Sequence, residues 1–346
     1  MNALFTYILT LIIPLAGGGN LLLHSKLQDS AFFSKGYTDV IKGMCCLIVI
    51  YVHVKPERGN LLQDAIGSFA YVCVTFFFLV SAYGMLRGLD RKKDYWKYFW
   101  RNRLASLLIP CLCVNIVVYI LSAFLNVKSD LALFYHIDEY VIILLQWCVW
   151  FYIVEWCRMK WFVEKKDTTL LILIIGVVVS SLYYYFFAFA KQDPDAGWCF
   201  ERMGLVWGIL LYRYYDRFVM WMDKSRILKI IVLTFIGGIL GVFYLKYKMI
   251  YFWGAYLMKI VLGFALLLLL FTATSKLKFD DVISNWLGSI SYEVYLIHRM
   301  ILAFMALLLP LSLNSGAYVF IVVFVTLLLS TGIHAIDKPI VKSLRK

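Results

Sequence analysis

The chain has 346 residues, of which 63% are hydrophobic and 16% are charged, and its formal net charge is +13. A typical soluble domain has roughly 25% charged residues, and a single soluble core stops growing near ~250–300 residues, so this composition argues against a soluble protein. The positive charge does not indicate nucleic-acid binding, because the basic residues lie in short segments between apolar runs and no nucleic-acid motif is present. Most of the chain is therefore expected to lie in a lipid bilayer.

Apolar segments in chain order predict an all-α, polytopic membrane bundle of about 10–11 transmembrane helices. The first is read as a retained helix, because no basic segment precedes it and Gly17-Gly18-Gly19 is not a cleavage signal. We therefore expect an extra N-terminal transmembrane helix in residues 1–25 and one membrane domain in residues 36–341. The predicted spans are 3–23, 38–54, 66–86, 104–126, 139–157, 168–189, 200–215, 228–245, 250–272, 287–309 and 316–335.

Basic residues are concentrated in alternate loops, which gives the expected orientation. Under the positive-inside rule these loops face the cytoplasm, so the N-terminus is expected outside a plasma or inner membrane and the C-terminus inside. The largest groups are Arg87, Arg91, Lys92, Lys93, Lys97, Arg101 and Arg103, then Arg158, Lys160, Lys165 and Lys166, then Arg213, Arg217, Lys224, Arg226 and Lys229, and the tail with Lys342, Arg345 and Lys346.

Residues 39–53 combine a charged start, an apolar middle and a histidine at the end. Lys42 and His53 are separated by about three helical turns, so both project from nearly the same helix face, ~16 Å apart along the axis. An ionisable side chain at membrane depth is costly and usually functional, which makes His53 a candidate functional residue. The structural alternative is a histidine whose polar atoms are satisfied within the packed bundle.

Other ionisable residues are expected near the depth of His53. At ~1.5 Å per residue, His298 enters from the cytoplasmic side to a similar level, and Lys259 reaches it from the outer face. Arg202 and Arg299 lie in the same half of the bundle. For these three cations, pairing with neighbouring polar groups or extension to lipid headgroups is the structural alternative.

The remaining polar residues indicate no metal or hydrolase chemistry. None of the motifs typical of serine hydrolases, zinc proteases or P-loop proteins is present, and the eight cysteines lack metal-ligand spacing. Neither disulfides nor zinc is predicted. Glu293 could pair with a lysine such as Lys42, although this signal is not specific, and an interfacial role suffices for His334.

A buried histidine beyond a cationic entrance suits acyl transfer. A neutral imidazole can take a proton from an attacking hydroxyl or accept an acyl group itself. Lysine and arginine side chains bind the phosphates of a donor such as coenzyme A.

Several motifs resemble those of the acyltransferase-3 family of integral-membrane acyltransferases. The segment from Asp39 to His53 resembles the opening helix of that family, with Lys42 where most members have arginine. Ser106 stands where a second arginine is usual. The other similar segments follow in the family's order: FFLVSAY at 77–83, RNRLASLLIP at 101–110, WFY at 150–152, GSISYEVYLIH at 288–298 and DKP at 337–339.

The resemblance implies transfer of an acyl group, usually acetyl, from cytoplasmic acyl-CoA to a hydroxyl of a cell-envelope glycan or lipid-linked sugar. His53 is then expected to be the catalytic base or acyl relay. The residues expected to hold the donor are Lys42, Arg103, Arg101 and Ser81, and those expected on the acceptor side are His298, Tyr292, Tyr295 and Lys259.

Two other functions are compatible with a polytopic bundle. A transporter or flippase of lipid-linked sugars would use the buried charges as a proton relay, but the chain lacks the repeats and paired broken helices typical of transporters. A non-catalytic scaffold in an envelope assembly leaves the two convergent histidines unexplained.

Overall fold

The computed structural model describes residues 4, 6–8, 22–23, 32–126, 136–161, 166–192, 198–278 and 282–345. Within these residues the chain is an all-α bundle, as predicted, and eight helices are long and apolar enough to cross a membrane. Two strands of two residues each, β1 (Leu22–Leu23) and β2 (Leu277–Lys278), pair antiparallel. The protein is therefore a multi-pass membrane protein.

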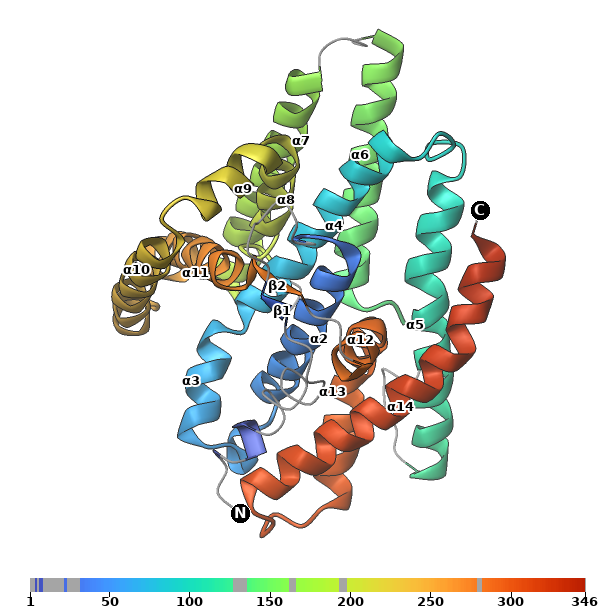
Figure 1. The fold of residues 1–346 in the computed structure, drawn as a ribbon. Helices are drawn as coiled ribbons and strands as arrows, with labels where there is room; N and C mark the ends of the chain where they lie inside the picture. Colours follow the sequence, from blue (N-terminus) through green and yellow to red (C-terminus); the bar gives the residue numbers. More distant parts are fainter. Residues whose placement is uncertain are drawn as a thin grey trace.

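The helices follow the predicted spans closely (Figure 1). Their bounds are α2 Lys35–Val52, α3 Leu61–Phe69, α4 Tyr71–Arg91, α5 Phe99–Phe124, α6 Glu139–Trp161, α7 Lys166–Phe187, α8 Met203–Arg213, α9 Tyr215–Asp223, α10 Arg226–Tyr247, α11 Lys259–Thr274, α12 Val282–Ser289, α13 Ser291–Leu308 and α14 Ser315–Leu344. A π-helical turn, Trp253–Met258, leads into α11.

Three details differ from the predicted spans. The span 287–309 is divided at Ile290 into α12 and α13, a short helix α3 precedes α4, and α9 was not predicted. Apolar periodicity cannot show a break inside a continuous apolar run, because the residues on both sides remain buried or in lipid. Most of the predicted first helix, 3–23, lies outside the described residues.

Helix α2 lies in the middle of the bundle, next to α3, α4, α12 and α13 (Figure 1). It has 18 residues and its buried positions point in all directions around the axis, which is typical of a central helix. In contrast, the buried residues of the 22-residue α10 are Leu233, Gly237, Gly241 and Tyr244. The rest of this apolar helix is expected to face lipid.

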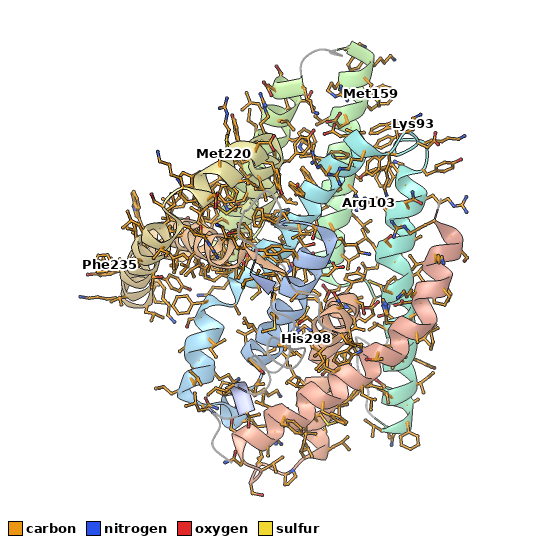
Figure 2. All side chains as sticks on the ribbon, in the orientation of Figure 1. Lys93, Arg103, Met159, Met220, Phe235 and His298 are labelled. Carbon is orange, nitrogen blue, oxygen red and sulfur yellow. The ribbon has the colours of Figure 1, made fainter. Side chains whose placement is uncertain are left out.

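The basic connections predicted to be cytoplasmic lie at one end of the bundle. Figure 1 shows the α4–α5 connection and the C-terminal end of α14 at the upper right, and the facing ends of α6 and α7 at the top, while the α13–α14 connection lies at the bottom. Lys93 and Arg103 lie in the upper half of Figure 2, and His298 lies in the lower half. The charge asymmetry expected from the sequence is therefore present in the fold.

Glycines allow α8 to approach α4 closely. A Cβ added at Gly204 would lie 2.0 Å from the carbonyl oxygen of Thr75, and one added at Gly208 would lie 2.3 Å from that of Leu79. The two glycines are four residues apart and so share one face of α8. Small residues at this spacing let helix backbones meet inside a membrane, where packing rather than the hydrophobic effect drives association.

We expect Gly204→Ala to destabilise the protein, because the added methyl group forces α8 away from α4. Overpacking of this kind costs ~1–3 kcal/mol. The measurement is the thermal unfolding midpoint of the purified protein in detergent. Gly332→Ala on α14 is the control, because a Cβ there has nothing within 4 Å. Equal midpoints for the two variants would contradict the close α4–α8 contact.

Candidate active site

A large basic cavity opens at the end of the bundle that carries the basic connections. Its volume is about 760 Å³, and α2, α4 and α5 form most of its wall. Asp39 is the single carboxylate among the described lining residues, and it forms an ion pair with Lys42 at 2.6 Å. The lining cations are Lys35, Lys42, Arg87, Arg91, Lys92, Arg103 and Arg345. This excess of positive charge favours a polyanionic ligand.

Hydrogen bonds fix several side chains on the wall of the basic cavity. Arg103 Nη2 donates to the hydroxyl of Tyr95 at 2.8 Å, which orients the guanidinium. Ser81 Oγ donates to the carbonyl oxygen of Phe77 at 2.9 Å within α4. Ser106 Oγ donates likewise to a carbonyl of its own helix, at 2.7 Å. Each serine keeps its oxygen lone pairs available to a ligand.

A smaller, inner cavity of about 280 Å³ continues from the basic cavity. The two share four lining residues, which are Lys42, Val80, Ser81 and Ser106. The inner wall is mostly apolar with a few hydroxyl groups, and its other residues are Cys46, Phe77, Leu107, Tyr140, Leu144, Ser291, Tyr292 and Tyr295. Together the cavities form a path from the basic end towards the middle of the bundle.

Tyr295 lies at the inner end of this path and contacts three rings. The ring centroids are 5.6 Å from Phe77, 4.8 Å from Tyr140 and 5.7 Å from His298. These packed aromatic side chains hold Tyr295 in place. His298 therefore contacts a side chain of the inner cavity wall.

His53 and His298 are in direct contact, with ring centroids 4.9 Å apart. Nδ1 of His53 lies 2.8 Å from the carbonyl oxygen of Val49, and Nδ1 of His298 lies 2.6 Å from that of Tyr295. A carbonyl oxygen only accepts hydrogen bonds, so Nδ1 carries the proton in both rings. In the neutral form, Nε2 of each ring is then the basic nitrogen.

The end of α2 holds His53 in position. His53 is the C-terminal capping residue, and the chain then turns into a 3₁₀ turn that begins at Pro56. The buried side chain of Gln63 donates to the carbonyl oxygens of Tyr51 at 2.7 Å and Val54 at 3.2 Å. These bonds satisfy carbonyls that the helix end leaves open, on both sides of His53.

The comparison with known families fits this geometry. The family model for the acyltransferase domain Acyl_transf_3 matches residues 35–335, nearly the whole chain. The chain belongs to the acyltransferase-3 family. It is therefore an integral-membrane acyltransferase. No significant match was found among curated proteins or solved structures.

Most of the residues predicted for the site in this acyltransferase come together in the fold. Lys42, Arg103 and Ser81 line the basic cavity, and Tyr292 and Tyr295 line the inner one. Tyr292 donates its hydroxyl to the carbonyl oxygen of Leu107 at 3.0 Å, which ties α13 to α5. His298 contacts His53, as expected from their depths.

Arg101 and Lys259 lie outside both cavities. Arg101 Nε donates to the carbonyl oxygen of Leu344 at 2.5 Å, at the end of α14. Lys259 Nζ lies over the ring of Phe200, 3.8 Å from its centroid, in a separate aromatic cluster. The predicted donor and acceptor roles of these two residues have no support from this arrangement.

The pairing of Glu293 with Lys42 that the sequence suggested is wrong. Lys42 pairs with Asp39 on its own helix, and Glu293 Oε1 instead lies 2.8 Å from Nδ1 of His334. His334 therefore has a buried partner, and it lies ten residues before the end of α14 rather than at a helix end. The reason is that α14 crosses α13, and a contact between residues 41 positions apart leaves no periodic signal in the sequence.

Sequence reasoning missed two residues of the site region. Tyr140, on α6, packs against Tyr295 and lines the inner cavity. Arg58 is buried and binds the carbonyl oxygens at the end of α13. The position of Arg58, five residues after His53 and between Pro56 and Gly59, could have indicated a role near the site. Nothing in the sequence distinguishes Tyr140 from other tyrosines.

Proposed function

We propose that this protein transfers an acyl group, in the expected case acetyl, from acyl-coenzyme A to a hydroxyl of a cell-envelope glycan or lipid-linked sugar. The observation that carries the proposal is that the cavity lined by seven cations joins the inner cavity, whose lining residue Tyr295 contacts His298, the neighbour of His53. The family fixes acyl transfer as the reaction. The shape and charge of the path favour a donor with a polyanionic head and a thin arm.

The donor fits the two cavities in turn. The nucleotide phosphates of coenzyme A would lie among Lys42, Arg103 and the other cations, because guanidinium and ammonium groups form strong charge-assisted bonds with phosphate. The arm and its thioester would enter the inner cavity past Ser81, towards Tyr295. Cavities of roughly 300–1,000 Å³ are typical of small-molecule sites, and the basic cavity lies in that range.

His53 would supply the proton chemistry. Its Nε2 takes the proton of the acceptor hydroxyl while that oxygen bonds to the acyl carbon. The carbon–sulfur bond then breaks, and the leaving thiolate receives the proton from His53, giving an ester and free coenzyme A. A covalent route through an acyl-histidine uses the same nitrogen and the same atoms.

The donor and the acceptor would approach from opposite sides. His53 caps the C-terminal end of α2, and Lys42 lies eleven residues before it, on the side of the helix's N-terminal end, where the cations gather. Under the positive-inside rule that end faces the cytoplasm, where acyl-CoA is made. The acceptor would then reach His53 from the other face of a plasma or inner membrane.

The test is a transfer assay with the purified protein in lipid nanodiscs. Release of free thiol from acetyl-CoA, together with an acetyl-sized mass increase on a surface glycan from the host, is the expected result. Movement of a lipid-linked sugar across vesicles without any mass change would instead support the transporter alternative. An acetyl increment on the host glycan that persists after deletion of the gene excludes that glycan as the acceptor.

We expect Arg103→Ala and Lys42→Ala to raise the KM for acetyl-CoA about 10-fold each, because each removes a charge-assisted phosphate contact worth ~1.5 kcal/mol or more. Initial rates at varied acetyl-CoA give KM, and both wild-type and variant values should rise with salt. Lys160→Ala, which removes an exposed cation of α6 at the same end, is the matched control. Unchanged KM in both cavity variants would place the donor elsewhere.

A further inference from the structure

A second cluster of polar side chains joins α13 to α14, away from both cavities. His334 and Asp337 are three residues apart on α14, and Glu293 faces them from α13. His334 Nδ1 lies 2.8 Å from Glu293 Oε1 and 3.8 Å from Asp337 Oδ1. One ligand atom from each residue lies within 4.8 Å of the other two. Figure 1 shows α14 crossing in front of α13.

The polar atoms of this cluster are not satisfied by the rest of the described chain. Glu293 is 3% exposed and Asp337 is 1% exposed. Within the residues that the structure describes, Glu293 Oε2, Asp337 Oδ2 and His334 Nε2 have no hydrogen-bond partner. Two buried carboxyl groups share one imidazole, and a buried carboxylate without compensation is strongly destabilising. A protonated His334 would offset only one of the two carboxylates.

We propose that Glu293, His334 and Asp337 bind one divalent cation that accepts both imidazole nitrogen and carboxylate oxygen, with Zn²⁺ or Mn²⁺ as the best-fitting class. Such ions take nitrogen and oxygen ligands at ~2.0–2.2 Å, which places neighbouring ligand atoms ~3–3.5 Å apart. The present spacings approach these values, so side-chain rotation suffices. Binding replaces the proton on His334 Nδ1, which leaves to solvent, and the two positive charges offset the two carboxylates.

The pattern of ligands explains why the sequence indicated no metal. His334-x-x-Asp337 gives two ligands on one helix face, a spacing also used in helical-bundle metal sites, but the third ligand is 41 residues away. Glu293 lies five residues before His298 on α13, about 7.5 Å along the axis. An ion at this site does not touch the histidine pair, so its role would be to fix α13 against α14 and thereby position His298.

Metal analysis of the purified full-length protein tests the proposal directly. The protein is purified through a tag without histidine, dialysed against metal-free buffer, and analysed by plasma mass spectrometry. We expect about one zinc or manganese ion per chain. After chelation, adding Zn²⁺ or Mn²⁺ should raise the thermal unfolding midpoint, and Mg²⁺ should do so less, because it disfavours imidazole.

Variants separate this site from adventitious binding. Glu293→Gln and Asp337→Asn each keep the shape of the side chain but remove a charged ligand, so both should lower the metal content at least fivefold. Glu155→Gln, which changes another buried carboxyl group paired with Arg158, should keep it. The proposal is overturned if the wild type contains less than a tenth of an equivalent and no added ion stabilises it. It is equally overturned if the bound metal persists in both cluster variants. Neither readout depends on acyl transfer, so the proposed function stands or fails separately.

Discussion

Replacing His53 with alanine should lower kcat for acetyl transfer by about 10²–10⁴-fold, the usual contribution of a positioned general base. Its neighbour His298 is buried between His53 and Tyr295, so it is not placed to replace the missing imidazole. The fold should survive, because the described hydrogen bond of His53 runs only to Val49 within the same helix. Turnover of acetyl-CoA in the presence of acceptor, measured beside the unfolding midpoint, gives both quantities.

Two further variants make this result specific. His136→Ala changes a histidine in the α5–α6 connection and should leave kcat unchanged. His298→Ala should also reduce kcat, because it removes the ring that contacts His53, but its loss of packing should lower stability as well. Normal turnover by a folded His53→Ala protein would contradict the catalytic role assigned to His53.

Arg58→Ala should lower the free energy of unfolding by ~1.5–3 kcal/mol, the range for a lost hydrogen bond to a charged group. Its guanidinium donates to the carbonyl oxygens of Pro310 at 3.1 Å, Ala306 at 3.2 Å and Leu309 at 2.6 Å. It also lies 4.5 Å from the ring centroid of Tyr318. Without Arg58, buried carbonyl oxygens at the end of α13 lose their hydrogen-bond donor.

The effect of Arg58 can be separated from that of charge alone. Lys55→Ala, which removes an exposed cation of the same connection, should change the free energy of unfolding by less than about 0.5 kcal/mol. Arg58→Lys should be intermediate, because an ammonium group cannot reach three carbonyls in a fixed plane. Denaturant titration in mixed micelles measures all three variants. A stability for Arg58→Ala equal to that of Lys55→Ala would show that the carbonyl contacts contribute nothing.

The sequence predicted the helical bundle well because lipid imposes a strong rule. Every backbone polar group must be satisfied inside the membrane, so each long apolar run between polar segments forms a helix. The same rule, with a fixed rise per residue, placed His53 and His298 at one depth from opposite parts of the chain. Their contact at 4.9 Å confirms that reasoning. The depth of a residue in the membrane depends on its position along its own helix, so it can be predicted from the sequence.

The sequence by itself determined that this protein crosses a membrane many times, which loops carry its positive charge, and which histidines lie deep in the bundle. Tertiary structure alone decided which side chains meet around each helix. Lys42 binds Asp39 rather than Glu293, Arg101 binds the end of α14, and Tyr140 joins the inner cavity. In lipid every face of a helix is apolar, so periodicity no longer tells which face meets a neighbour. Rotation and crossing then depend on small residues such as Gly204 and on distant contacts such as Glu293 with His334.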